Sequence, residues 1–286
     1  MIACLWGLSV AVVEVGLRTF PPLLLSAFRY YVAGALLLGY VAVTTDDWYP
    51  ETRMDVVAVC GGGVFWIAVG NGVWFVGQEL TTSVLSGLMM SLTPIATVSV
   101  SWVLLPEDRL TLVSLVGLFV SFGGALLLLR PADTATISAA VVGKALLLVG
   151  VLGLAVGSSL IRWASASLPS TTRTAWSALL GAVVIHSLSV LSGEQWGLSV
   201  TMTGLVSLLY LSVGATAFAY VLFFSLLDRY PAIEVTLITY LVPLVAAVVG
   251  WSLFDEPITR RMVAGFLVIV VGFSLMKYRA LRNELD

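Results

Sequence analysis

The sequence predicts an all-α membrane protein with ten transmembrane helices in two inverted five-helix repeats. The first reason is composition: of 286 residues, 59% are hydrophobic and 10% are charged, and the mean hydropathy is +1.05. Soluble domains carry about 25% charged residues, so a soluble globular fold is excluded. The second reason is that the long apolar runs match membrane-crossing helices of roughly 20 residues. The third is that the two halves of the chain repeat each other.

Ten apolar segments, separated by turn signals, define the expected helices. Each segment is apolar around its whole circumference, which is typical of a spanning helix and not of a barrel strand with alternating faces. In chain order the expected spans are residues 2–17, 23–43, 56–77, 82–105, 111–129, 143–163, 172–191, 203–227, 233–254 and 262–278. The connections are short and carry Pro, Gly or acidic residues, so we expect the function to lie inside the helix bundle.

The orientation follows from Lys and Arg, which are enriched in cytoplasmic loops. An even number of spans places both termini on the same side. With the termini inside, eight basic residues are cytoplasmic and five are outside. We therefore expect a multi-pass protein of the cytoplasmic cell membrane with both termini in the cytoplasm. The opening MIACLWGLS has no basic region and no A-x-A cleavage site, so we interpret it as a mature first helix.

An offset of 149 residues superimposes the ends of the two halves. The matched pairs are Pro94 and Pro243, Trp102 and Trp251, Glu107 and Glu256, and Gly123 and Gly272. Each half holds five spans, an odd number, so the second half is upside down relative to the first. Such inverted repeats are typical of secondary transporters and of some channels. We assign residues 1–132 to the first repeat, with helices 1–5, and residues 133–286 to the second, with helices 6–10.

The chain resembles the drug/metabolite transporter superfamily, and within it the ten-helix branch built from two EamA-type repeats. The resemblance rests on Trp6-Gly7, on PPLLLSAFRYYVAGALLL at 21–38, and on the duplicated segments 94–107 and 243–256. It implies an exporter or exchanger of small organic solutes, monomeric or loosely oligomeric, with a central cavity between the halves. Members carry amino acids, nucleotide sugars, drugs and other metabolites, so no single solute is implied. We expect no cofactor, no metal and no nucleic-acid partner.

Two ionisable residues fall within the first two expected spans, where a central charge costs at least about 2.5 kcal/mol. Many EamA-type sequences have a lysine or a neutral residue where this chain has Glu14. The small four-helix branch of the superfamily places a proton-binding glutamate in its first helix, so Glu14 is our candidate for proton coupling. The alternative is an ion pair with Arg18 or Arg29. Arg29 stays charged, so it neutralises Glu14, binds helix-end carbonyls or presents a positive charge to the cavity.

Polar and aromatic side chains mark one face of the third expected span and one face of the eighth. Asn71, Trp74 and Gln78 recur at i, i+3 and i+7, and Thr216 and Tyr220 lie on the matching face of the eighth span. We expect these residues to line the cavity, with Asn71, Trp74 and Tyr220 converging near the bilayer midplane between the halves. The alternative is hydrogen bonding and packing between helices.

The other intramembrane candidates have plainer interpretations. Glu234, near the start of the ninth span, is expected at the cytoplasmic mouth of the cavity, or else as an ordinary acid at a helix N-terminus. His186 is the only histidine, and we interpret it as a packing residue more readily than as a proton relay. Glu107 and Glu256 close helices four and nine and are interpreted as turn residues that mark the repeat.

Three classes of function compete. The chain has no G-x-x-x-x-G-K-[ST] loop, so it does not hydrolyse nucleotides by that route. It shows no His cluster, no paired catalytic carboxylates and no Ser-His constellation, which argues against an intramembrane enzyme. A structural protein would not explain the inverted duplication. The sequence thus predicts a secondary transporter that works by alternating access, with an enzyme or a structural membrane protein as the alternative.

Overall fold

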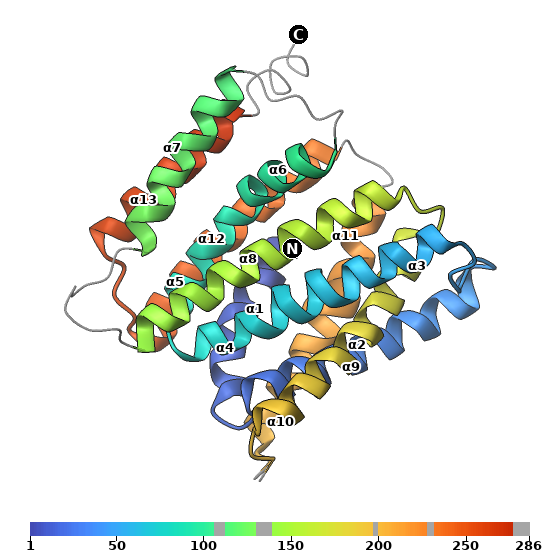
Figure 1. Cartoon of the computed structure of the whole chain (residues 1–286). Coiled ribbons are helices and arrows are strands. Elements are labelled where there is room, and N and C mark those ends of the chain that lie inside the picture. The colour runs from blue at the N-terminus through green and yellow to red at the C-terminus, as the bar shows by residue number, and fades with distance from the viewer. Residues whose placement is uncertain (106–111, 130–138, 197–199, 228–231, 277–286) are drawn as a thin grey trace.

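The computed structural model of this chain describes residues 1–105, 112–129, 139–196, 200–227 and 232–276, with all their side chains except those of residues 224, 227 and 232–240. Within these ranges the chain consists of helices and their connections, and no strand is present (Figure 1). The first part contains α1 (Ile2–Leu17), α2 (Pro22–Thr44), α3 (Arg53–Cys60), η1 (Gly61–Val73), α4 (Trp74–Glu79), α5 (Ser83–Met89), η2 (Met90–Leu92), α6 (Thr93–Leu104) and α7 (Leu112–Leu129). The second contains α8 (Ala139–Ala164), α9 (Ser170–Ser192), α10 (Met202–Leu209), η3 (Tyr210–Phe218), α11 (Ala219–Leu227), α12 (Ala232–Phe254) and α13 (Arg260–Met276).

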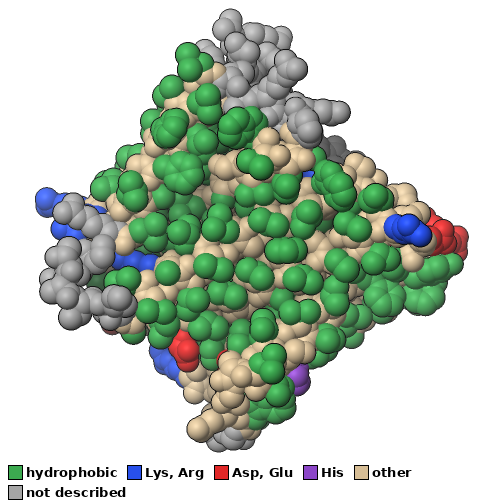
Figure 2. Space-filling view, in the orientation of Figure 1, with side chains coloured by type: hydrophobic (Ala, Val, Ile, Leu, Met, Phe, Trp, Pro, Cys, Tyr) green, Lys and Arg blue, Asp and Glu red, His purple; other side chains and the backbone are tan. Residues whose placement is uncertain are grey.

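Seven continuous helical stretches of the described residues are long and apolar enough to cross a membrane. They are Pro22–Thr44, Arg53–Glu79, Ser83–Leu104, Leu112–Leu129, Ala139–Ala164, Ser170–Ser192 and Met202–Phe223. Shorter apolar helices are Ile2–Leu17 and Leu241–Phe254. Figure 2 shows a molecular face covered by hydrophobic side chains, with charged side chains at its margins. This surface belongs in lipid, and the count of ten crossings stays a prediction.

Local capping signals explain where the helices begin. Thr52 and Asp55 form a capping box in which the Thr52 hydroxyl accepts from the Asp55 N–H and the Asp55 carboxylate accepts from the Thr52 N–H. Helix α3 therefore starts at Arg53, three residues before the expected span. Thr201 caps α10 in a similar way, because its hydroxyl accepts from the Gly204 N–H. The two capping threonines are 149 residues apart, the offset found in the sequence.

The chain leaves α geometry for π geometry at two corresponding places. The π-helical segments η1 and η3 begin at Gly61 and Tyr210, again 149 residues apart. A π-helix bonds residue i to residue i−5, so its turn is wider than that of an α-helix, and such segments recur at functional sites. Two side chains follow the same spacing: the Asn71 amide donates to the Trp66 carbonyl (2.9 Å), and the Thr216 hydroxyl donates to the Leu211 carbonyl (2.7 Å).

Helices α7 and α13 lie side by side (Figure 1) along a seam of glycines. A Cβ built on Gly124 would lie 2.7 Å from the Gly265 carbonyl oxygen, and a Cβ built on Gly272 would lie 2.5 Å from the Gly117 carbonyl oxygen. The sequence match of Gly123 with Gly272 is therefore wrong by one residue, because a Cβ on Gly123 would meet nothing within 4 Å. The chain has one residue fewer between Glu256 and Gly265 than between Glu107 and Gly117, which shifts the offset to 148 in this helix.

Close helix contacts also build the rest of the bundle. Helix α2 packs along α9, α8 packs along η1 and α6, and α12 packs along α1 and α5. Gly157 of α8 lies directly against η1, where a built Cβ would be 2.6 Å from the Trp66 backbone nitrogen. Gly7 of α1 sits in the same way against Val245 of α12. Small residues let backbones approach, and this close packing is what holds membrane helices together.

Candidate functional site

A buried arginine lies where α2 meets the π-helical segment η3. Arg29 is 6% exposed, and its Nε donates to Thr216 Oγ1 at 2.8 Å. The Thr216 hydroxyl in turn donates to the Leu211 carbonyl, so its hydrogen is used within η3 and its oxygen accepts from Arg29. Thr216 itself is fully buried. The two residues form a fixed polar pair inside an apolar bundle.

The guanidinium of Arg29 lies between two rings. Its Cζ is 5.2 Å from the ring centroid of Tyr30 and 5.7 Å from that of Phe75, within the range of cation–π attraction. Arg29 forms no other hydrogen bond and no ion pair with the part of the chain that the structure describes. Neither of its two terminal nitrogens is completely buried without a hydrogen-bond partner. Both terminal nitrogens are therefore without a hydrogen-bond partner among the described residues, yet neither is completely buried.

An aromatic cluster lies next to this pair. The Trp6 indole N–H donates to the Ala215 carbonyl at 3.0 Å, and its ring meets Tyr220 edge-on with centroids 6.0 Å apart. Trp66 approaches the other side of Tyr220 at 5.7 Å. Tyr220 lies one turn after Thr216. Residues of α1, η1 and α11 thus surround one point beside Arg29.

The structure brings only some of the expected cavity residues together. Arg29, Thr216 and Tyr220 are neighbours. Trp74 is 5% exposed and packs against α8, where a Cβ on Gly150 would lie 3.0 Å from its ring, so it belongs to a different apolar cluster from Tyr220. Asn71 is half-buried and bonded within its own helix. The expected face assumed 3.6 residues per turn, which the π geometry up to Val73 does not have.

Gln78 acts as a brace between helices. Its side chain is 1% exposed, and its Nε2 donates to the Val10 carbonyl of α1 at 2.6 Å. This contact corresponds to the structural alternative considered for the polar face, interhelical hydrogen bonding. Sequence reasoning did not place Trp6 or Trp66 in the site. The signals for them were a single tryptophan in the first expected span and two tryptophans, Trp66 and Trp74, in the glycine-rich third span.

Glu14 is half-buried in α1 and forms no ion pair with Arg18 or Arg29 in the described structure. The Arg18 guanidinium lies over the Phe254 ring at 5.7 Å instead, and Arg29 is held by Thr216. The charged groups close to Glu14 are Glu256 and Arg18. The alternative of a Glu14–Arg29 pair is thus not what the structure contains, and the Glu14 carboxylate is left without a guanidinium that fixes it.

Two carboxylates tie the helix ends on the side of the bundle where α1 ends. Glu256, after α12, accepts from the N–H groups of Ser83 (2.9 Å) and Val84 (2.7 Å) at the start of α5. Glu194, after α9, accepts from the N–H groups of Leu23 (2.9 Å) and Leu24 (3.0 Å) at the start of α2. Each carboxylate satisfies free donors and favours the positive helix end. Glu256 is therefore more than a turn residue, and Glu194 was not singled out from the sequence.

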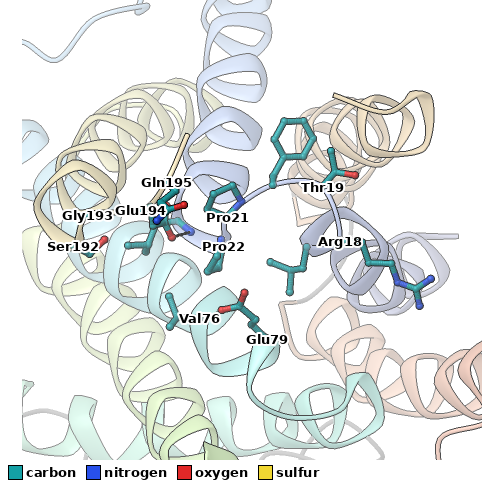
Figure 3. Close-up of a pocket in the computed structure, with 13 residues that line it drawn as sticks. Arg18, Thr19, Pro21, Pro22, Val76, Glu79, Ser192, Gly193, Glu194 and Gln195 are labelled. Atoms are coloured by element: carbon teal, nitrogen blue, oxygen red, sulfur yellow. Dashed lines mark hydrogen bonds between the residues drawn. The ribbon is translucent and has the colours of Figure 1, made fainter. Parts of the chain in front are cut away.

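A pocket of about 580 Å³ opens on the same side, between the α1–α2 turn, the end of α4 and the segment after α9. In Figure 3 the Glu79 carboxylate points toward Pro22, Glu194 lies across from it, and the Arg18 guanidinium points away. Glu79 is exposed. Two acids, Glu79 and Glu194, and one base, Arg18, line this opening.

The Glu256 contact predicts a measurable loss of stability. Glu256→Gln is expected to lower the free energy of unfolding by about 1–2 kcal/mol, because one neutral oxygen replaces two charged acceptors at the α5 N-terminus. Asp255→Asn is the matched control, since Asp255 is exposed and asparagine tolerates its φ of 52°. Thermal or denaturant unfolding in detergent measures both variants. Equal stability of the two would contradict this role of Glu256.

The remaining candidates add little to the site. His186 packs its ring against Tyr31 and Trp196, with centroids 5.9 and 5.0 Å apart, as suits a packing residue. Glu234 belongs to α12, but its side chain lies outside what the structure describes, and Glu107 lies outside the described residues. In the described residues no group of three or more His, Cys, Asp or Glu side chains is placed to hold a metal ion.

A family profile, curated relatives and a solved structure are similar to this chain. The profile of the EamA-like transporter family matches residues 1–130 and 141–278. Similar relatives include an uncharacterized transporter of Archaeoglobus fulgidus (23% identical, covering 95% of this chain and 94% of the relative) and protein PecM of Dickeya dadantii (27% identical, covering 96% and 92%). A solved crystal structure superimposes with a TM-score of 0.69 at 19% identity, over 99% of this chain and 96% of that one.

Proposed function

The chain belongs to the EamA-like transporter family, and on that premise we propose that it is a secondary transporter of small organic solutes that works by alternating access. The observation that carries the proposal is the buried Arg29–Thr216 pair, in which the two terminal nitrogens of the guanidinium have no hydrogen-bond partner among the described residues. An ionisable group inside a membrane bundle is expensive and points to a binding site. Relatives from archaea and bacteria are named as transporters, which favours transport over an enzymatic or purely structural role.

We propose that residues 1–132 and 133–286 are two inverted repeats that supply ten spans. The paired threonine caps and the paired π segments support this proposal. The packing supports it too, because each contact between the halves has a counterpart in which the equivalent helices have changed places. The contact of α1 with α12 corresponds to that of α8 with α6, and the contact of η1 with α9 corresponds to that of η3 with α2. A site at the junction of such repeats is reached from either side when one repeat rocks against the other.

The proposed working parts follow from this arrangement. Arg29, Thr216 and Tyr220 bind the solute, with Trp6 and Trp66 as the aromatic wall, while Trp74 and Gln78 hold η1 and α4 against their neighbours. Both termini are cytoplasmic in this proposal, so the pocket beside Glu194 faces outward and Glu14 is reached from outside. Glu14 is the group that couples solute movement to protons.

Counterflow in proteoliposomes tests the transport function. Vesicles preloaded with one unlabelled member of a panel of amino acids, organic acids and amphipathic drugs are expected to take up the same labelled solute faster than empty vesicles. Only a carrier gives such trans-stimulation, because exchange needs no net driving force. If no solute of the panel is trans-stimulated by folded, reconstituted protein, the transporter proposal fails.

A further inference from the structure

We infer that the Arg29–Thr216 site takes the carboxylate of an organic acid with an apolar or aromatic body, and that Thr216 is the positioning residue that aims the guanidinium at it. This inference rests on the proposed function and names the class of solute. It follows from which donors of Arg29 are used, from the charge around Arg29, and from the rings beside it.

The donors of Arg29 divide into one that is used and a pair that is not. Nε donates to Thr216 Oγ1, and the two terminal nitrogens have no hydrogen-bond partner among the described residues and are not completely buried. The outer edge of a guanidinium, with its two terminal nitrogens, presents two parallel N–H groups at the spacing of carboxylate oxygens. A lysine at this place would offer only a point charge. The free edge therefore matches a planar carboxylate in two-point contact.

The charge around Arg29 also favours an anion. Among the described side chains no carboxylate contacts this 6%-exposed cation, and Glu14 is not paired with it. A buried charge without a counter-charge is costly, and an incoming carboxylate supplies the missing one. A neutral amide of the same shape would leave the charge unbalanced. The preference is thus for the ionised acid over its amide.

Thr216 fixes the direction of the guanidinium through the π geometry of η3. Hydroxyls in α-helices elsewhere in the chain donate to the carbonyl four residues back, as Thr97 of α6 does to Thr93 and Ser158 of α8 to Leu154. Thr216 instead donates five residues back, to Leu211. With its hydrogen held there, the oxygen is an acceptor for Arg29 Nε, and this contact fixes the guanidinium at its Nε while leaving both terminal nitrogens available to a solute.

The rings near Arg29 describe the rest of the solute. Phe75 and Tyr30 flank the guanidinium, and Trp6, Trp66 and Tyr220 are in edge-on or tilted contact a short way along η3 and α11. Contact between these rings and an apolar or aromatic solute would stabilise the bound state. A polyhydroxylated body would leave its hydroxyls without enough partners among these rings.

Binding is measured on the full chain purified in detergent, by tryptophan fluorescence and by thermal shift. The probes are phenylacetate, indole-3-acetate and hexanoate, each compared with its own amide. Each acid is expected to bind at least about tenfold more tightly than its amide, because a charge-assisted pair is lost. Arg29→Gln and Arg29→Lys should remove this difference, and Arg53→Gln, which changes an exposed arginine, should keep it.

The role of Thr216 is tested by a matched pair of variants. Thr216→Val keeps the shape and loses the hydroxyl, whereas Thr216→Ser keeps the hydroxyl. Valine is expected to reduce the acid-to-amide affinity ratio about tenfold, and serine should restore most of it. A merely structural role would weaken acid and amide alike and leave the ratio unchanged, which would overturn the positioning role.

If the variants do not fold, the inference can still be tested on the protein without substitutions. Phenylglyoxal reacts with accessible guanidinium groups, and mass spectrometry locates the adducts. Arg29 is expected to be modified despite its burial, and saturating phenylacetate should protect it while Arg53 stays reactive. An Arg29 that never reacts, or acids that bind no better than their amides, would overturn the inference.

These outcomes are separable from those of the transport test. Arg29-dependent binding of acids without counterflow of any solute would refute transport and keep the carboxylate site. Counterflow of neutral or cationic solutes, with no Arg29-dependent binding of the three acids, would keep transport and refute the carboxylate site.

Discussion

Glu14→Gln is expected to abolish accumulation of solute driven by a pH gradient while leaving solute exchange largely intact. Glutamine keeps the shape of the side chain and removes its titration. Glu14 is half-buried near the C-terminal end of α1, and no guanidinium of the described residues holds it in an ion pair. A carboxylate that is neither fully solvated nor locked by a cation is suited to exchange a proton with the solution. This prediction rests on the proposed transport function.

The measurement compares two experiments on the same proteoliposomes. With an imposed proton gradient, the variant should accumulate solute no better than protein-free vesicles, whereas its counterflow should stay within about twofold of the original protein. Glu51→Gln, in the exposed connection between α2 and α3, is the matched control and should behave like the unchanged protein. Normal gradient-driven accumulation by the Glu14 variant would show that this residue does not couple protons.

Gly157→Leu is expected to prevent folding. A Cβ at this position would lie 2.6 Å from the backbone nitrogen of Trp66 and 2.9 Å from its Cα, so the obstacle is backbone that no rotamer change can move. Leucine would separate α8 from η1 and displace Trp66 from Tyr220. Overpacking in a well-packed core lowers the free energy of unfolding by about 1–3 kcal/mol. Because this clash is with backbone and affects a whole helix interface, the loss is expected to be at or above the upper end of that range.

The control is the same substitution at Gly123, where a built Cβ meets nothing within 4 Å. The Gly123→Leu variant should be purified in normal yield and unfold at a temperature close to that of the original protein. The Gly157→Leu variant should be recovered mainly as aggregate, or should unfold well below it. If size-exclusion profiles and unfolding temperatures of the two variants coincide, the tight contact between α8 and η1 does not contribute to stability as described.

Hydropathy and turn chemistry predicted the helical segments well, because crossing a bilayer requires long apolar runs whatever the tertiary contacts. The sequence also pointed to Arg29, since a buried charge must have a reason. The expected convergence of Asn71, Trp74 and Tyr220 is not found in the structure, because the hydropathy pattern does not reveal where a helix changes from 3.6 residues per turn to the wider π turn. Glu194 escaped notice because its partners, the N–H groups of α2, lie some 170 residues away in the chain.

The residues along the seam between α7 and α13 pair as they would across the interface of a symmetric dimer. Gly117 faces Gly272 and Gly124 faces Gly265, while Ser121 meets Ile269 at the middle of the seam, its hydroxyl 3.4 Å from that carbonyl. With the offset of 148, Gly117 corresponds to Gly265 and Gly124 corresponds to Gly272, so the first pair corresponds to the second with the two helices interchanged. The interface is therefore isologous, with the same patch on both sides. A single half-length chain would carry both surfaces of such a seam, so two identical copies could have met antiparallel along it before they were joined.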